Sequence, residues 1–182
     1  MRKVEVVPYE TNWPLMYAAE ANLLSAVFGE ELVRIHHIGS TSVPCLQSKP
    51  IIDMLAEVRD IQKIECLNPA MIATGYTPMG EYGIPGRRYF FKGSEERHSY
   101  HLHAFQTGHA EVARHLLFRD YLRSHLQEAM QYASLKESLA ARFPNDIDAY
   151  MQGKDAFIKE VDRKAAAWSL SRSHLSASPE KQ

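Results

Sequence analysis

The amino-acid sequence predicts an α+β fold (mixed α/β), in which a small mixed sheet is flanked by helices and followed by a C-terminal helical layer. Short apolar runs separated by turn residues extend to about residue 107, and a helical period fills residues 109–172. With 182 residues, 45% of them hydrophobic, the chain is long enough for one domain with its own core. We therefore expect a single domain over residues 1–172 and a flexible polar tail over 173–182.

The first third of the chain predicts one helix and two strands. Valines in residues 4–7 suggest a short extended arm, and residues 11–14 (TNWP) supply a cap and a proline for a helix that ends near Gly29. Apolar residues dominate residues 32–38 and 50–58, which we interpret as two buried strands. The segment between these strands is rich in glycine and hydroxyl residues.

Residues 60–105 predict a helix, a hairpin and a strand, and the chain after them is helical. Asp60 caps an expected helix to about Thr74 that Pro69 can kink, and the glycine-rich segment 76–91 predicts a hairpin. A further strand is expected at 99–105. The expected C-terminal helices are Glu111–His125, Glu128–Arg142 and Asp146 to about Ser171.

Charge and cysteine content limit the possible partners. The formal net charge is −1, so no overall basic field favours long nucleic acid, and a small nucleotide substrate fits better. Cys45 and Cys66 are too few for a disulfide scaffold and suit a reducing interior. No segment has the length and apolarity of a signal peptide or membrane span. These features predict a soluble cytoplasmic protein that does not enter a membrane.

The connection between the two strands predicts an anion site. Gly39 allows close approach of the backbone to a ligand, and the hydroxyls of Ser40, Thr41 and Ser42 can donate hydrogen bonds to phosphate oxygens. Asp53 follows inside an apolar strand, where an ionised carboxylate is costly unless a cation meets it. A metal ion is a common partner of this kind in a phosphate site.

Five motifs carry a resemblance to a known family. They are GSTSVPCL at 39–46, KPIIDM at 49–54, YGIPGRRYF at 82–90, HLH at 101–103 and HLLFRDYLR at 115–123. In this order they resemble the GrpB family, over nearly all of the chain to about Arg163. The Gly-Ser pair followed by a strand-borne Asp is similar to the polymerase-β-like nucleotidyltransferase superfamily. The resemblance implies a nucleotidyltransferase-like fold.

The resemblance also implies a reaction. A nucleotidyl group would pass from a nucleoside triphosphate to an acceptor that the sequence does not identify. Gly39 and Ser40 would bind the β- and γ-phosphates, and Asp53 would hold a divalent metal, with Mg²⁺ expected first and Zn²⁺ or Mn²⁺ as alternatives. One departure weakens the match, because Leu55 stands where the superfamily has a second carboxylate. Glu57 lies roughly 13 Å from Asp53 along an extended strand and is too far to replace it.

Two histidines extend the candidate site. His101 and His103 share one face of the expected strand at 99–105, and Asp53 could lie on a neighbouring strand. Together the three side chains would form a catalytic centre and a metal site with an open position. The alternative is that one histidine packs against the core while the other donates a hydrogen bond to Asp53 or a ligand. His98, in a polar turn, carries no strong signal.

Four cations are candidates for phosphate binding. Lys49 lies close to the Gly-Ser segment and offers a point charge, while Arg87 or Arg88 could clamp a triphosphate. Because alternate residues of a strand face opposite ways, at most one of these arginines should face Asp53. Arg119 is a candidate because it lies in the HLLFRDYLR motif. For each cation the alternative is a structural or solvent-exposed ion pair.

Two further positions bear on the site. Tyr150, Lys154 and Phe157 share a helical stripe for which packing is the favoured interpretation, although Lys154 could reach a ligand across a cleft. Cys45 occupies a position that is glycine in the family pattern. If the backbone there has a positive φ angle, cysteine costs about 1 kcal/mol or more.

Three functions remain open at this point. The first is metal-dependent nucleotidyl transfer. The second is a non-catalytic accessory domain that binds a nucleotide or a coenzyme phosphate, since related domains occur fused to dephospho-coenzyme A kinase and suggest a link to coenzyme A biosynthesis. The third is a metallohydrolase with histidine ligands.

Overall fold

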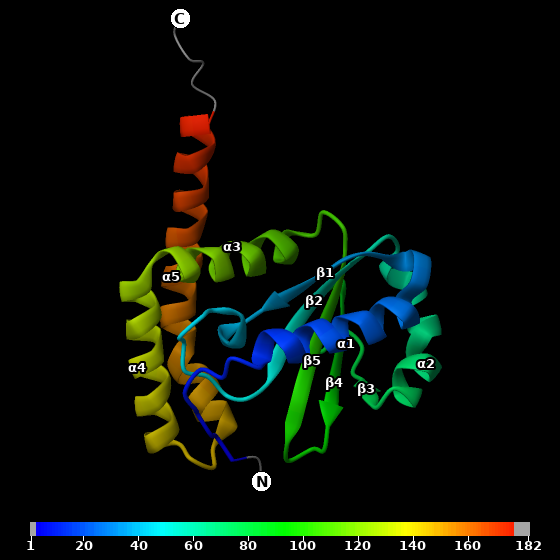
Figure 1. Cartoon of the computed structure of the whole chain (residues 1–182), viewed down its shortest axis with the longest axis horizontal. Helices are drawn as coiled ribbons and strands as arrows, with labels where there is room; N and C mark the ends of the chain where they lie inside the picture. The colour runs from blue at the N-terminus through cyan, green and yellow to red at the C-terminus, as the bar shows by residue number, and fades with distance from the viewer. Residues whose placement is uncertain (1–2, 177–182) are drawn as a thin grey trace, which may run out of the picture.

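A five-stranded mixed sheet forms the centre of the molecule (Figure 1). The computed structural model describes residues 3–176, with side chains to residue 172. The strand order is β1-β2-β5-β4-β3, and β2 and β5 are parallel while the other neighbours are antiparallel. The strands are β1 Leu32–Ile38, β2 Ile52–Val58, β3 Tyr76–Pro78, β4 Arg87–Gly93 and β5 His98–Gln106. The N-terminal arm forms an isolated antiparallel bridge between Val7 and Ser48.

Helices pack on both faces of this sheet. They are α1 Trp13–Phe28, α2 Asn68–Ala73, α3 Ala110–Ser124, α4 Leu126–Arg142 and α5 Ile147–Ser176. One core joins α1 and α2 to the sheet, and α3 covers the opposite face. A third cluster packs α4 and α5 against α3 and the segment after β1. The predicted α+β fold with a C-terminal helical layer is therefore confirmed.

The alternation of side chains along β2 decides where the candidate site lies. Ile52, Met54, Ala56 and Val58 are fully buried in the core beneath α1 and α2. Leu55 packs with Phe105 and Val112 on the opposite face. Since strand side chains alternate, Asp53 lies on the same face as Leu55, toward the C-terminal helices.

The expected helix over residues 60–74 is wrong in its first half. Residues Ile61–Leu67 form 3-10 turns, and the α-helix begins only at Asn68. Asp60 does cap this segment, because its carboxylate accepts a hydrogen bond from the backbone N–H of Gln62 at 2.9 Å. Pro69 explains the break, since proline fits the first turn of a helix but lacks the N–H that an interior position needs.

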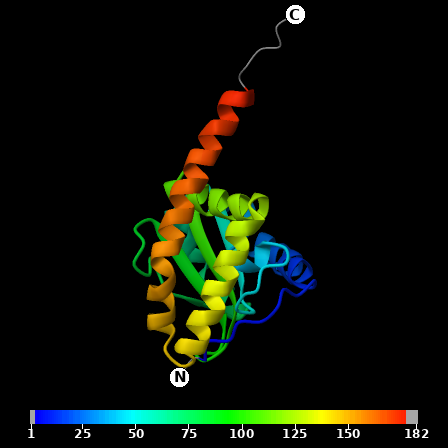
Figure 2. The same ribbon diagram turned by 90° about the vertical axis from the view of Figure 1, so that its left-hand side faces the viewer.

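The C-terminal helix is longer than the sequence predicts. Figures 1 and 2 show α5 running past the rest of the molecule, and it continues to Ser176 instead of ending near Ser171. Residues 173–176, expected in a flexible tail, are therefore helical. Residues 177–182 lie outside the described residues. Within residues 3–176, no helix has the length and apolar character needed to cross a membrane.

Candidate functional site

The candidate site begins where β1 ends beside β2. Ile38 pairs with Asp53, so the next residue, Gly39, turns directly over the carboxylate. Gly39 has a φ of 67°, and a Cβ atom there would lie 2.5 Å from Oδ2 of Asp53. Both the backbone angle and this contact require glycine. The strand pair thus places a loop backbone and a carboxylate together, as the sequence predicts.

The three hydroxyl residues of this loop have different roles. Ser42 donates to the Gly39 carbonyl at 2.6 Å, and Thr41 donates to the Ile51 carbonyl at 3.3 Å. Both side chains are buried and stabilise the loop. The Ser40 hydroxyl instead makes a side-chain hydrogen bond with Tyr132 of α4. Ser40 is therefore the hydroxyl that faces the space between the loop and the helical layer.

Asp53 and His101 form the centre of the site. They are register partners on the parallel strands β2 and β5, and Nδ1 of His101 lies 3.0 Å from Oδ1 of Asp53. Burial opposes ionisation of Asp53, but the hydrogen bond and charge of His101, with the charges of His103 and Lys49, lower its pKa to about 2. Asp53 is therefore a carboxylate at neutral pH.

A second imidazole extends this pair. Nδ1 of His98 lies 2.8 Å from Nε2 of His101, and the His98 ring stacks on Phe91. When His101 is neutral and donates to Asp53, its Nε2 accepts from His98. Both ring nitrogens of His101 then have protein partners. His98, which the sequence did not single out, belongs to the site.

His103 has a different environment from His101. It lies beside Arg87, whose Nη1 donates to Nδ1 of His103 at 3.3 Å. Burial and the neighbouring His115 of α3 lower the pKa of His103 to about 3, and burial with the charge of Arg114 lowers that of His115 to about 3. Both imidazoles are neutral at pH 7, and His103 is an acceptor for the guanidinium.

The arginines separate as the strand alternation predicts. Arg87 faces the histidines, whereas Arg88 pairs with Glu65 at 2.9 Å and approaches Glu81 at 3.8 Å. Arg119 of α3 donates to the His37 carbonyl at 3.2 Å and contacts Asp120 at 2.7 Å. Arg88 and Arg119 therefore have structural partners, and Arg87 is the arginine placed at the site.

Buried lysines from the helical layer complete the site. Lys136 of α4 is 2% exposed and donates a hydrogen bond to the Gln47 carbonyl, while Lys154 of α5 is 7% exposed. Lys154 lies 4.8 Å and Lys49 lies 5.2 Å from the centre of the Tyr150 ring. Two helices and the segment before β2 thus bring three ammonium groups together.

The lysines interact electrostatically with Asp53. Burial lowers the pKa of Lys136 to about 7, with the charge of Lys154 acting in the same direction and that of Asp53 opposing it. Burial also lowers the pKa of Lys154, and Asp53 again opposes the shift. Uncompensated buried cations are costly, so a site with three lysines and this one carboxylate favours an anionic ligand.

Lys136 can be singled out only when the buried side of α4 is known. Lys136 stands in the stripe of Ala129, Tyr132 and Leu139, all of which are buried. A lysine at a core position of an amphipathic helix is unusual and needs a buried partner. Packing of the stripe on α5 is also observed, since Tyr150 is 1% exposed and Phe157 joins the helical cluster. Lys154 lies within that packed stripe.

Whether the site can hold a metal ion depends on how many protein ligands that ion needs. Among residues 3–176, no group of three or more His, Cys, Asp or Glu side chains is arranged to hold one. His101 and His103 would have to give up their hydrogen bonds to become ligands. Mg²⁺ has weaker demands on the protein, because it commonly binds through one or two carboxylates and the phosphates of a substrate. Asp53 alone fits that arrangement.

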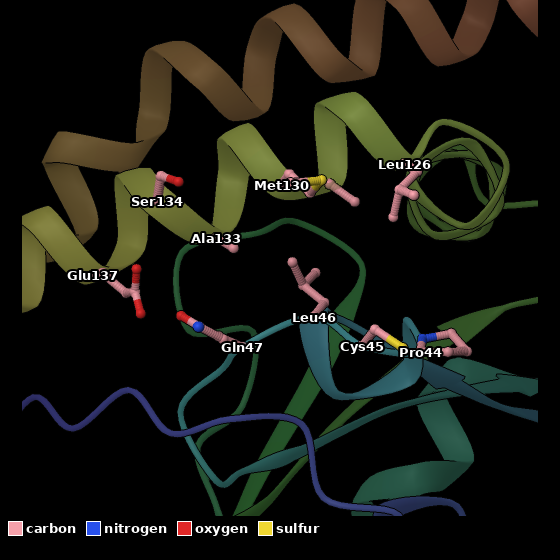
Figure 3. A pocket seen from close by; sticks show the side chains of 10 residues that line it. Pro44, Cys45, Leu46, Gln47, Leu126, Met130, Ala133, Ser134 and Glu137 are labelled. Carbon is pink, nitrogen blue, oxygen red and sulfur yellow. The ribbon is translucent and has the colours of Figure 1, made fainter.

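A shallow groove of about 210 Å³ lies beside the site (Figure 3). Leu46 and Cys45 line one wall, and Leu126, Met130 and Ala133 of α4 line the other. Cys45 has a φ of 64°, so the backbone at this family glycine position does have a positive angle. The cysteine is exposed and carries the strain that glycine would avoid.

Comparison with known proteins identifies the family. The model of the family described as "GrpB protein" matches residues 3–164. The chain belongs to the GrpB family.

Similar proteins come from several bacteria. The UPF0157 protein YqkA of Bacillus subtilis is 48% identical over 177 residues, which cover 97% of this chain and 51% of YqkA. This chain thus spans about half the length of that relative. The crystal structure of the conserved protein GrpB from Enterococcus faecalis superposes with a TM-score of 0.88 at 41% identity, covering 91% of this chain and 99% of that one. This match confirms the fold across the family.

Two matches are distant. A dephospho-CoA kinase of Mycolicibacterium paratuberculosis is 24% identical over 91% of this chain and 46% of its own length. The Cid1 poly(U) polymerase superposes on 72% of this chain and 44% of its own, with a TM-score of 0.45 at 10% identity, which is too low to carry an argument. The family model and the Enterococcus faecalis structure establish the GrpB family, and membership of a fold does not by itself establish an activity.

Proposed function

We propose that this GrpB protein binds a nucleoside triphosphate together with Mg²⁺ and transfers the nucleotidyl group to an acceptor. The observation that carries the proposal is the carboxylate of Asp53, held against Gly39 and electrostatically coupled to Lys49, Lys136 and Lys154. A triphosphate supplies the negative charge that the three lysines require, and its oxygens complete the shell of a cation on Asp53. The motif resemblance to nucleotidyltransferases supports the same ligand.

The metal ion, when bound, would neutralise negative charge on the phosphates. Asp53 would hold it, and the alternative ions Zn²⁺ or Mn²⁺ would draw in His101 or His103. Ser40 and the backbone around Gly39 would contact the terminal phosphates, as would the lysines. Thr41 and Ser42 would support that loop from behind.

The transfer step would be an in-line displacement at the α-phosphorus. A bond forms between an acceptor oxygen and phosphorus as the bond from phosphorus to the pyrophosphate oxygen breaks. The proton of the acceptor would pass to solvent water, and pyrophosphate would leave with its charge stabilised by Lys136 and Lys154. Burial keeps His103 neutral, and the hydrogen bond from Arg87 would hold its imidazole in place.

A second function has its own observation. Leu55 is fully buried two residues after Asp53, so the second carboxylate of the nucleotidyltransferase pattern is absent from this position. Glu57 does not replace it, because its carboxylate contacts His36 at 2.7 Å. An accessory domain that binds a nucleotide or a coenzyme phosphate without turnover would need only the cationic site. The distant dephospho-CoA kinase relative favours a coenzyme A context for that alternative.

A third function and the location follow from the same residues. A histidine-liganded metallohydrolase requires His101 and His103 to exchange their present hydrogen bonds for a metal.

We place the protein in the cytoplasm, since its two cysteines are free and exposed.

Calorimetric titration with ATP, with and without Mg²⁺, tests the proposal. We expect Mg²⁺-dependent binding that Asp53→Asn weakens at least 10-fold, with Asp155→Asn on the exposed side of α5 as the matched control. Release of pyrophosphate in the presence of candidate acceptors, lost in Asp53→Asn, would support transfer. ATP binding without turnover would favour the accessory domain. Binding unaffected by Asp53→Asn would contradict both.

A further inference from the structure

An exposed tyrosine stands next to the candidate site in the loop before β4. The ring of Tyr82 belongs to a side chain that is 62% exposed, and its backbone φ is 45°. The neighbouring positive angles at Gly80, Gly83 and Gly86 fall on glycines, which tolerate them. A bulky residue in this region of backbone space is an outlier and is strained. The loop therefore holds a strained backbone at Tyr82.

Arg87 fixes the loop in this conformation. Its Nη2 donates to the Tyr82 carbonyl at 2.6 Å, and its Nε donates to the Glu81 carbonyl at 3.1 Å. The Glu81 carboxylate in turn accepts from the backbone N–H of Gly86 at 2.7 Å. The same guanidinium donates to His103, so the position of Tyr82 is tied to the histidines of the site.

A chain of ring contacts leads from Tyr82 to Asp53. The Tyr82 and Tyr89 rings stack with centroids 5.1 Å apart and an interplanar angle of 14°. Tyr89 is mostly buried, and its ring lies 5.7 Å from that of His101 and 5.2 Å from that of His103. His101 contacts Asp53. Tyr82 is therefore the solvent-facing end of a series of ring contacts that leads through Tyr89 to His101, which bonds to Asp53.

We propose that Tyr82 is a stacking platform for the nucleobase of the nucleotide bound at Asp53. This inference rests on the proposed function and adds the position of the base. With the phosphates held by the lysines, the base extends toward the hairpin, and its π-face lies on Tyr82. Stacking is available to every base, so the four nucleoside triphosphates bind with similar affinity. Tyr82 thus contributes affinity for a base without selecting one.

Calorimetric titration of four proteins with two probes tests the platform. The proteins are wild type, Tyr82→Ala, Tyr82→Phe and Tyr82→Gly, and the probes are ATP and tripolyphosphate, each with Mg²⁺. We expect Tyr82→Ala to weaken ATP binding by between about five-fold and 100-fold. Tyr82→Phe keeps the ring and the affinity. Tripolyphosphate, which has no base, binds all four proteins equally.

The glycine variant separates stacking from loop structure. Tyr82→Gly relieves the positive φ angle, so its thermal stability stays at or above that of Tyr82→Ala while its ATP affinity falls equally. Loss of tripolyphosphate binding in these variants would show that the tyrosine shapes the loop and would overturn the platform. So would unchanged ATP affinity in Tyr82→Ala, or ATP binding no tighter than tripolyphosphate binding in wild type. Failure of wild type to bind either probe would reject the proposed function and the platform together.

Discussion

The sheet and the C-terminal helical layer contribute opposite charges to the same site. The sheet supplies Asp53, whose pKa is about 2, and the imidazole of His101 bonded to it. The helices supply Lys136 and Lys154, buried beside tyrosines, with pKa values below the usual lysine range. The sheet half contributes one carboxylate with Lys49 nearby, whereas the helical half contributes two buried ammonium groups whose charge an anionic ligand would compensate. The comparison leads us to expect that a ligand binds at the interface between the two halves.

The strongest way to break this comparison is to remove the helical charges. In the double variant Lys136→Met and Lys154→Met, we expect tripolyphosphate affinity to fall at least about 100-fold, because each charge-assisted contact contributes about 1.5–3 kcal/mol. Calorimetric titration measures the effect. Lys159→Met, on the exposed side of α5, is the control and should bind as wild type does. An unchanged affinity in the double variant would place the ligand on the sheet alone.

The sheet side is tested by Gly39→Ala. The added Cβ would meet Asp53 Oδ2 at 2.5 Å and would also strain the backbone at a φ of 67°. We expect the free energy of unfolding to fall by at least about 2 kcal/mol in chemical denaturation. Gly29→Ala is the matched control, since Gly29 has a φ of 55° with no atom near the new Cβ, and its cost should be about 1 kcal/mol. Equal losses of the free energy of unfolding in the two variants would show that Asp53 moves away from the added Cβ atom at little cost.

The pH dependence of stability sharpens the helical side. The pKa of Lys136 is about 7 in the folded protein and close to 10.5 in an unfolded chain. Between these values the unfolded chain binds more protons, so this residue makes the free energy of unfolding rise with pH from about 7 to about 10. Lys136→Met should flatten this rise by more than about 1.4 kcal/mol, the equivalent of one pKa unit. Parallel curves of the free energy of unfolding against pH for wild type and Lys136→Met would show that the pKa of Lys136 does not change on folding.

The smallest effect is expected in the loop between β1 and β2, which packs against the helical layer. Cys45→Gly removes the side chain from a φ of 64°, and we expect a gain of about 1 kcal/mol in the free energy of unfolding. Cys66→Gly is the contrast, because Cys66 is equally exposed but lies in the 3-10 turns Ile61–Leu67, where glycine is destabilising. A loss of stability in both variants would mean that Cys45 has a packing role beside the groove of Figure 3.

The two halves also differ in how well the sequence predicts them. Local signals sufficed for the sheet side: the strands around Gly39 and Asp53 follow from apolar runs, and the hairpin follows from the glycines between Tyr76 and Arg88. The partner of Asp53 was anticipated only as an alternative, because strand order cannot be read from one sequence. The hydrogen bond from His101 depends on β2 and β5 being neighbours.

The helical side was less predictable for a physical reason. Lysine is usually solvent-exposed in a helix, so Lys136 gives no signal unless the buried stripe around it is already known. Pro69 led to a wrong prediction of where the helix begins. A proline there allows either a kinked helix or a helix that begins late, and in the structure the helix begins late. The continuation of α5 to Ser176 has no local stop signal that the sequence could reveal.

The parallel pairing of β2 with β5 has a kinetic consequence. Asp53 and His101 are 48 residues apart, and the hairpin of β4 and β5 can form locally before it docks on β2. We expect contacts made across this long loop to form late, after most of the folding barrier has been crossed. Substitutions at Asp53 should therefore accelerate unfolding and leave the folding rate nearly unchanged, whereas substitutions inside the hairpin should slow folding itself.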